Sequence, residues 1–195
     1  MIRLIIRPAL QVLLRKDDME RNIDILRRQE EMLRFDTFDN ESAYALGCFL
    51  VQRAKELSLE VALSVRSADG AVLFQYLCDG ATALNDNWLR RKANTVIKMG
   101  ASSLRGTYTL ESNGETIEDN GLSKTDYALC GGGFPVRLKG MEHVIGAVCC
   151  SNMYHIADHE FVVDRLREYL ECPEAPSYPY TLPQLTDDGL SCQKR

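Results

Sequence analysis

The pair Asp158 and His159, near the end of the chain, is the best candidate for acid-base or metal chemistry. Asp158 is expected to cap a helix, which would place His159 in the first turn, at the positive end of the helix dipole. An imidazole in that position stays neutral and can accept a proton or bind a metal. His155 lies four residues earlier, before the expected helix, and no third ligand is evident. A metal site is therefore one interpretation, and a structural cap or interface contact is the other.

A second candidate is a cluster of one aromatic and two basic side chains. Trp88, Arg91 and Lys92 have the spacing i, i+3 and i+4, which places them on one face of a helix. That face could hold a planar anionic ligand by stacking on the indole and by charge. The alternative is that Trp88 packs in a core or an interface, with the basic residues solvated or paired with acids.

Three successive glycines form the third candidate. Gly131, Gly132 and Gly133 lead into Phe134. The backbone N–H groups of such a run could form a cradle for a carboxylate or phosphate, with the ligand between this strand and the Trp88 helix. The alternative is a bulge or tight strand entry, where a glycine accommodates a crossing helix or a neighbouring backbone. The spacing matches neither a dinucleotide loop nor a phosphate loop.

Hydrophobic periodicity predicts the elements that position these residues. Helices are expected at residues 17–34, 40–57 and 85–99 and after an Asp158 cap, with Asn40 as the cap of the second helix. Two-residue alternation around Asp69-Gly70 predicts a hairpin of residues 60–66 and 72–76, and residues 134–138 and 144–150 predict another. An irregular hydrophilic region is expected from 100 to 120. Hairpins interleaved with helices predict an α+β fold.

Composition predicts one soluble domain with two appendages. The 195 residues are 45% hydrophobic, enough for a core, and no run is long enough to span a membrane. Residues 1–19 form a basic apolar N-terminal extension, 20–171 the domain and 172–195 a proline-rich surface tail. The net charge is −5, and the four basic residues among the first sixteen leave −9 for the remainder. An acidic body disfavours nucleic acid as a partner.

The number and spacing of the cysteines indicate the redox state of the cellular compartment. Seven are scattered along the chain without a Cys-x-x-Cys pair, a pattern typical of reduced thiols and of a cytoplasmic protein. Cys149 and Cys150 adjoin in an apolar strand, where their side chains point to opposite faces and are expected to be buried. The basic apolar N-terminus leaves a mitochondrial transit peptide as the alternative.

Several separated motifs together resemble a known family. In order they are Leu33-Arg34-Phe35-Asp36-Thr37-Phe38, Ala45-Leu46-Gly47, Asn85-Asp86-Asn87-Trp88-Leu89-Arg90-Arg91-Lys92, Ser102-Ser103, Gly131-Gly132-Gly133-Phe134-Pro135-Val136, Val144-Ile145-Gly146 and Asp158-His159-Glu160. From about residue 20 to 171 the chain is similar to an uncharacterised subfamily of the haem-degrading-domain family, whose better-known relatives are secreted haem-binding sensors and the glycolate-operon protein. One departure is Asn152, at a turn where the family has glycine. Asparagine tolerates the left-handed backbone that such a turn needs.

The resemblance implies a fold and a choice of partners. The fold is a profilin-like sandwich, a curved antiparallel sheet flanked by helices, assembled into a homo-oligomer. Haem or a similar planar anion is implied as ligand, although the haem ligands of the distant relatives map onto no motif in this chain. A eukaryotic member of the subfamily is associated with delivery of tail-anchored membrane proteins, which implies an adaptor with a protein partner.

Three functions are open from the sequence. The first is a non-catalytic ligand-binding protein, with haem as a candidate cofactor and either His155 or His159 as a candidate iron ligand. The second is an oligomeric adaptor or scaffold, in which Asp158 and His159 would contact a neighbouring subunit and no pocket would remain between Trp88 and Gly132. The third is an acid-base or metal-dependent enzyme that uses His159, and no catalytic pattern in the sequence supports it. The ligand-binding residues of the first hypothesis are Trp88, Arg91, Lys92, Gly131, Gly132, Gly133, Phe134, Asp158 and His159.

Overall fold

The computed structural model describes residues 6–179, 184–186 and 189–191. Its helices are α1 (Ile6–Met32), α2 (Asn40–Glu56), α3 (Ala83–Met99), α4 (Ser103–Asn113), the short 3-10 helix η1 (Glu118–Asn120) and α5 (His155–Tyr169). Its strands are β1 (Ala62–Ser67), β2 (Val72–Leu77), β3 (Gly133–Val136), β4 (Gly146–Ser151), β5 (Gln184–Thr186) and β6 (Gly189–Ser191). The parts of the expected appendages at 1–5, 180–183, 187–188 and 192–195 lie outside the described residues.

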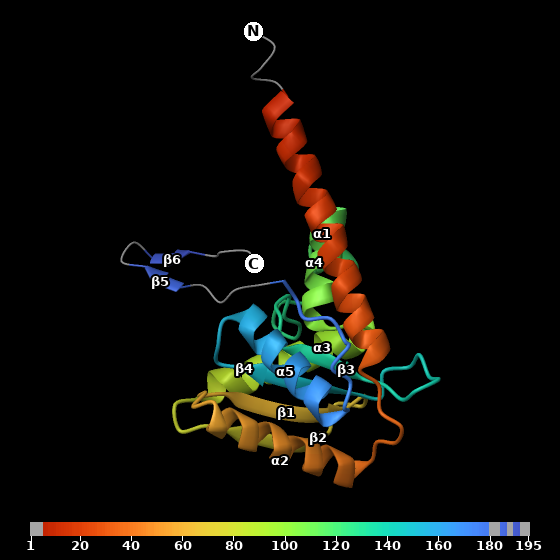
Figure 1. Ribbon diagram of the computed structural model, residues 1–195, viewed down its shortest axis with the longest axis vertical. Coiled ribbons are helices and arrows are strands. Elements are labelled where there is room, and N and C mark those ends of the chain that lie inside the picture. The colour runs from red at the N-terminus through yellow and green to blue at the C-terminus, as the bar shows by residue number, and fades with distance from the viewer. Residues whose placement is uncertain (1–5, 180–183, 187–188, 192–195) are drawn as a thin grey trace.

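An antiparallel sheet with the order β2-β1-β4-β3 forms the centre of the molecule. Side chains alternate between its faces, so Leu63 and Val148 join the core under α2 and α5, whereas Ala62 and Cys149 face α3. Figure 1 shows the resulting layers, with helices on both faces of the sheet. Cys149 and Cys150 are both fully buried, on opposite faces, as expected. This is the α+β architecture that the sequence predicted.

The two predicted hairpins are confirmed. β1 pairs with β2, and Gly70 in the turn between them has a φ of +93°, a conformation that glycine adopts without strain. β3 pairs with β4. The predicted cap of α2 is wrong by one residue: Asp39 is the N-cap, its carboxylate accepts the N–H of Ser42 at 2.8 Å, and Asn40 is the first helical residue.

The expectation of an irregular region from 100 to 120 is wrong, because most of it is helix α4. Ser102 caps this helix by accepting the N–H of Arg105 at 3.2 Å, and Gly114 ends it with a φ of +72°. Leu104 and Leu110 are buried along it. The helix is short and most of its residues are polar, so its apolar periodicity is too weak to stand out in the sequence.

The start of α5 also differs from the prediction. The helix begins at His155, with Tyr154 as its N-cap residue, so Asp158 lies inside the first turn and does not cap it in the expected way. The Asp158 carboxylate still accepts a backbone N–H from the loop before the helix, that of Met153, at 3.1 Å. His155 is therefore helical and shares a helix face with His159.

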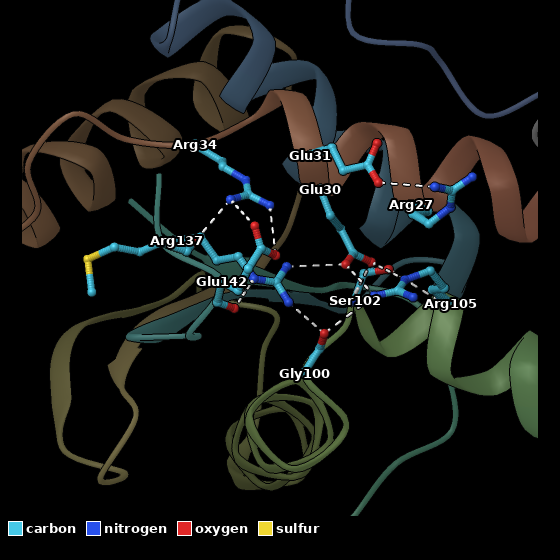
Figure 2. A network of polar contacts seen from close by, with 10 residues as sticks. Arg27, Glu30, Glu31, Arg34, Gly100, Ser102, Arg105, Arg137 and Glu142 are labelled. Atoms are coloured by element: carbon cyan, nitrogen blue, oxygen red, sulfur yellow. Dashed lines mark hydrogen bonds and ion pairs between the residues drawn. The ribbon is translucent and has the colours of Figure 1, made fainter. Parts of the chain in front are cut away.

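A buried carboxylate fixes α1 to the body of the protein. Glu30 accepts hydrogen bonds from Nε and Nη2 of Arg105, both at 2.8 Å, from the N–H of Ser102 at 2.8 Å, and from Arg137 at 3.3 Å. Arg137 also donates to the carbonyl oxygen of Gly100, the residue that ends α3, at 2.6 Å. Figure 2 shows this convergence of α1, α3, α4 and the end of β3. The network holds the C-terminal end of the helix that carries the site residues.

The chain shows no structural break at either end of the predicted domain. α1 is continuous across residue 19, and beyond the network it runs alongside α4 and projects from the body (Figure 1). At the other end, Gln29 donates to the carbonyl oxygen of Pro176 at 2.8 Å, and Ala175 and Tyr178 are buried. The start of the expected surface tail thus packs on the domain. The division at residues 19 and 171 stays a prediction.

Candidate functional site

A pocket of about 320 Å³ opens between α3 and the connection from β4 to α5. We call it the Trp88 pocket. Its walls come from three separate segments of the chain, which meet at the C-terminal end of β4. Its lining residues are Asn85, Trp88, Lys92, Cys130, Ser151, Asn152, Met153, His155 and Asp158.

A buried ion pair lies at the wall of this pocket. Nζ of Lys92 donates to Oδ2 of Asp158 at 2.7 Å and to the carbonyl oxygen of Cys150 at 2.8 Å, and both charged side chains are 2% exposed. Oδ1 of Asp158 accepts the N–H of Met153 and the thiol of Cys150. Burial is the largest single influence and lowers the pKa of Lys92, but the charge and hydrogen bond of Asp158, together with Cys130 and Cys150, make the net shift upward. Lys92 therefore stays an ammonium, with one of its three N–H groups left for a ligand among the described contacts.

His155 presents a neutral imidazole to the same pocket. Its Nδ1 accepts the N–H of Gly131 at 3.2 Å, so the proton of the neutral ring lies on Nε2. The ring is half-buried, and burial, with a smaller contribution from Lys92, lowers its pKa below the usual 6.5. His155 is thus a hydrogen-bond donor at neutral pH.

Trp88 and Arg91 form a stacked pair beside the pocket. The Arg91 guanidinium lies 4.3 Å from the centre of the indole and donates to the carbonyl oxygen of Tyr127 at 3.1 Å. The indole lines the pocket, whereas Arg91 does not. Of the predicted basic cluster, only Lys92 reaches the pocket wall, because i+3 and i+4 positions on α3 diverge around the helix axis by about a quarter of a turn.

The three glycines allow close packing of backbone and side chains. A Cβ on Gly131 would lie 2.3 Å from the carbonyl oxygen of His155, and one on Gly132 would lie 2.5 Å from that of Cys150. Gly132 also has a φ of +110°. Gly133 donates its N–H to the Ser103 hydroxyl at 2.9 Å. The glycines therefore let α3 and α5 approach this strand, and they are outside the pocket lining, as is Phe134, which is buried in the core.

His159 points away from the pocket, into the contact between α5 and α1. Gln29 uses its amide nitrogen on Pro176, so its amide oxygen is the acceptor for Nε2–H of His159, at 2.9 Å. The side chain has no exposed surface, and burial, followed by the charges of His155 and Lys92, lowers its pKa to about 3. The imidazole is neutral, as expected, but burial is the leading cause. Neither His159 nor Asp158, which is 1% exposed, has surface to offer a neighbouring subunit.

Several pocket residues were not among the predicted site residues. Asn85 bonds to Asn152 at 3.1 Å, and Asn152 donates to the carbonyl oxygen of Glu60 at 2.9 Å. Asn152 has a φ of +102°, so this asparagine makes the left-handed turn anticipated from the sequence. Cys130 and Met153 also line the pocket. The motif that contains Asn85 and the unusual turn at Asn152 were the available signals.

The comparisons with known proteins agree with this architecture. The family model described as "Haem degrading protein HbpS-like" matches residues 38–167, two thirds of the chain. The chain belongs to this family. A UPF0303 protein from Rhizobium rhizogenes is 42% identical to it over 148 residues, which cover 76% of this chain and 90% of that protein. The motif-based resemblance is thereby confirmed.

Solved structures of the HbpS-like fold support the sandwich. The crystal structure of the Ybr137w protein has a TM-score of 0.70 at 24% identity and covers 76% of this chain and 87% of that one. A PduOC:haem complex has a TM-score of 0.54 at 19% identity, with coverage of 67% and 91%. At these identities the likeness shows the fold, which is the predicted profilin-like sandwich. No described helix is long and apolar enough to cross a membrane.

The described histidines do not fit iron ligation in the Trp88 pocket. The outward nitrogen of His155 carries the ring proton, because its other nitrogen accepts from Gly131. His159 is buried against Gln29 and does not line the pocket. Within the described residues no three His, Cys, Asp or Glu side chains are grouped to hold a metal ion. The volume of about 320 Å³ also lies at the lower end of ligand pockets, roughly 300–1,000 Å³.

Proposed function

We propose that this HbpS-like protein is a non-catalytic binding protein for a small planar anion, which occupies the Trp88 pocket. The observation that carries the proposal is the imbalance of donors and acceptors there. Both oxygens of Asp158 already accept hydrogen bonds, whereas Lys92 and His155 each keep a donor. A ligand must therefore supply acceptors, and a carboxylate does so with charge complementary to the ammonium.

The indole supplies the second element of recognition. Trp88 lines the pocket on the side of α3, and Arg91 stacks on the indole and adds positive charge nearby. An anionic aromatic or conjugated ring could lie against the indole while its carboxylate reaches Lys92 and His155. One solved relative with this fold, PduOC, forms a complex with haem, which supports ligand binding by this fold. The geometry of this chain favours a ligand without a bound iron.

The first test uses Trp88 as a natural reporter, because it is the only tryptophan in the sequence. Benzoate, a planar ring with one carboxylate, is titrated while Trp88 fluorescence is recorded. We expect a saturable change with one site per chain. His155→Ala should raise the dissociation constant by about tenfold or more, since a hydrogen bond to a charged group is worth about 1.5–3 kcal/mol. His143→Ala changes an exposed histidine outside the pocket and should leave the constant unchanged.

A parallel titration with haemin separates the two ligand classes. We expect no saturable absorbance shift of a histidine-ligated iron. A shift at one haemin per chain that His155→Ala abolishes would replace the small anion by haem. Absence of any saturable change with benzoate, or equal weakening by both histidine variants, would contradict the proposal. A cytoplasmic location and assembly as a homo-oligomer are part of the same proposal, and light scattering tests the latter.

A further inference from the structure

A second pocket, of about 210 Å³, lies on the other side of the connection between β4 and α5. We call it the Leu57 pocket. Apolar side chains form most of its wall, and Leu57 at its edge is 51% exposed. Its lining residues are Leu57, Leu59, Met153, Ala157, Glu160, Phe161, Asp164 and Arg165.

The two pockets have one lining residue in common, Met153. Its backbone is held in place, since its N–H is bonded to Asp158 and the preceding Asn152 is bonded to Glu60. Its side chain is unbranched, and a methionine side chain repacks at low cost. A change of rotamer at Met153 could therefore join the two pockets without moving the loop.

The polarity of the two pockets differs in a way that defines a ligand class. The Trp88 pocket offers the ammonium of Lys92 and the Nε2–H of His155. Leucine, methionine, alanine and phenylalanine side chains form most of the Leu57 pocket, and three charged residues complete its wall. We infer that the ligand is amphipathic: a planar anionic head in the Trp88 pocket and a short hydrocarbon arm that passes Met153 into the Leu57 pocket. This inference rests on the proposed function and adds the arm to it. The arm would cover apolar surface that Leu57 leaves open to water.

The test compares benzoate with 4-pentylbenzoate, again through Trp88 fluorescence. Each buried methylene strengthens binding roughly three- to fourfold, so a five-carbon arm that is only partly buried should gain at least tenfold. Ala157→Leu fills the Leu57 pocket from α5 and should remove this gain while leaving the benzoate constant unchanged, because Ala157 does not line the Trp88 pocket.

A second pair of variants keeps the test decisive if Ala157→Leu does not fold. Leu57→Ser makes the edge of the Leu57 pocket polar and should also reduce the gain from the arm. Leu84→Ser changes another exposed leucine, 62% exposed and outside both pockets, and should retain it. Both positions are on the surface, so both variants should fold.

The outcomes separate this inference from the function on which it rests. A gain of tenfold or more that Ala157→Leu abolishes, Leu57→Ser reduces and Leu84→Ser retains supports the amphipathic ligand. If benzoate binds but the pentyl arm adds nothing, or its gain survives in Ala157→Leu, the inference is overturned and the proposed function stands. If neither acid gives a saturable change, the proposed function fails and the inference fails with it.

Discussion

The Lys92–Asp158 ion pair gives the most quantitative prediction about the site. The two charged atoms are 2.7 Å apart and both side chains are 2% exposed, so neither charge can turn to water if its partner is removed. At an effective dielectric constant of about 20, their Coulomb attraction is about 6 kcal/mol. Much of this attraction offsets the loss of hydration, and removal of one partner from such a pair costs about 3–5 kcal/mol.

The prediction is a double-variant cycle with Lys92→Met and Asp158→Asn. Lys92→Met leaves a buried carboxylate that keeps two weaker partners, Met153 and Cys150, so we expect the lower end of the range, about 3 kcal/mol. Asp158→Asn leaves a buried ammonium and should cost a similar amount. The double variant contains no buried charge, and its loss should be about 3–4 kcal/mol, below the sum of the single losses by about 2–3 kcal/mol.

Urea denaturation followed by circular dichroism measures all four proteins, and the comparison requires equal slopes against urea. Domains of this size have total stabilities of about 5–15 kcal/mol, so the single variants should remain folded in water at low temperature. Additivity of the two single losses to within about 0.5 kcal/mol would refute the reasoning, because it would mean that the two charges do not stabilise one another.

Three further predictions concern glycine and titratable groups. Gly132→Ala should lower the free energy of unfolding by more than about 3 kcal/mol, because its Cβ would lie 2.5 Å from the carbonyl oxygen of Cys150. Gly70→Ala is the control: this glycine has a similar positive φ but open space around it, so the substitution should cost only about 1–2 kcal/mol in the same urea assay. His159 has a pKa of about 3 in the folded chain, so between about pH 6.5 and 3 it binds a proton only when the chain is unfolded. The free energy of unfolding of the parent should therefore fall as pH drops through that window. His159→Gln should reduce the slope of the free energy of unfolding against pH by up to ~1.4 kcal/mol per pH unit. An unchanged slope between pH 6.5 and 4.5 would contradict this. Burial, and then Asp164, raises the pKa of Glu160 to about 7, so the folded chain loses stability as pH rises from about 4.5 to 7. Glu160→Gln should therefore increase the free energy of unfolding by about 1–2 kcal/mol at pH 8 but not at pH 4. Equal effects of the substitution at both pH values would contradict this prediction.

Local structure was largely predictable from the sequence. The hairpin at Gly70 follows from alternation on both sides of a turn dipeptide, and the left-handed turn at Asn152 follows from the residue type. Failures occurred where the local signal was weak or ambiguous. The α4 helix was missed for lack of a clear apolar stripe, and the start of α5 was placed four residues late because Asp158 looks like a cap.

The candidate site was predicted in part. Trp88, Lys92 and Asp158 do line one pocket, but Arg91 stacks on the indole without lining the pocket, and His159 faces α1. A helical spacing tells which residues share a face, and it does not tell which neighbouring element that face meets. The rotation of a helix about its own axis is set by the packing of the whole core.

The sequence by itself determined most of the elements and the turn residues, because these depend on contacts between near neighbours in the chain, and its separated motifs determined the family. Tertiary structure alone decided which polar groups became partners. Lys92 meets Asp158 across 66 residues and His159 meets Gln29 across 130, and each pairing exists because the buried groups must satisfy their charges and hydrogen bonds within the fold. That requirement engages both oxygens of Asp158, leaves one donor each on Lys92 and His155, and so fixes which hydrogen-bonding groups the pocket presents.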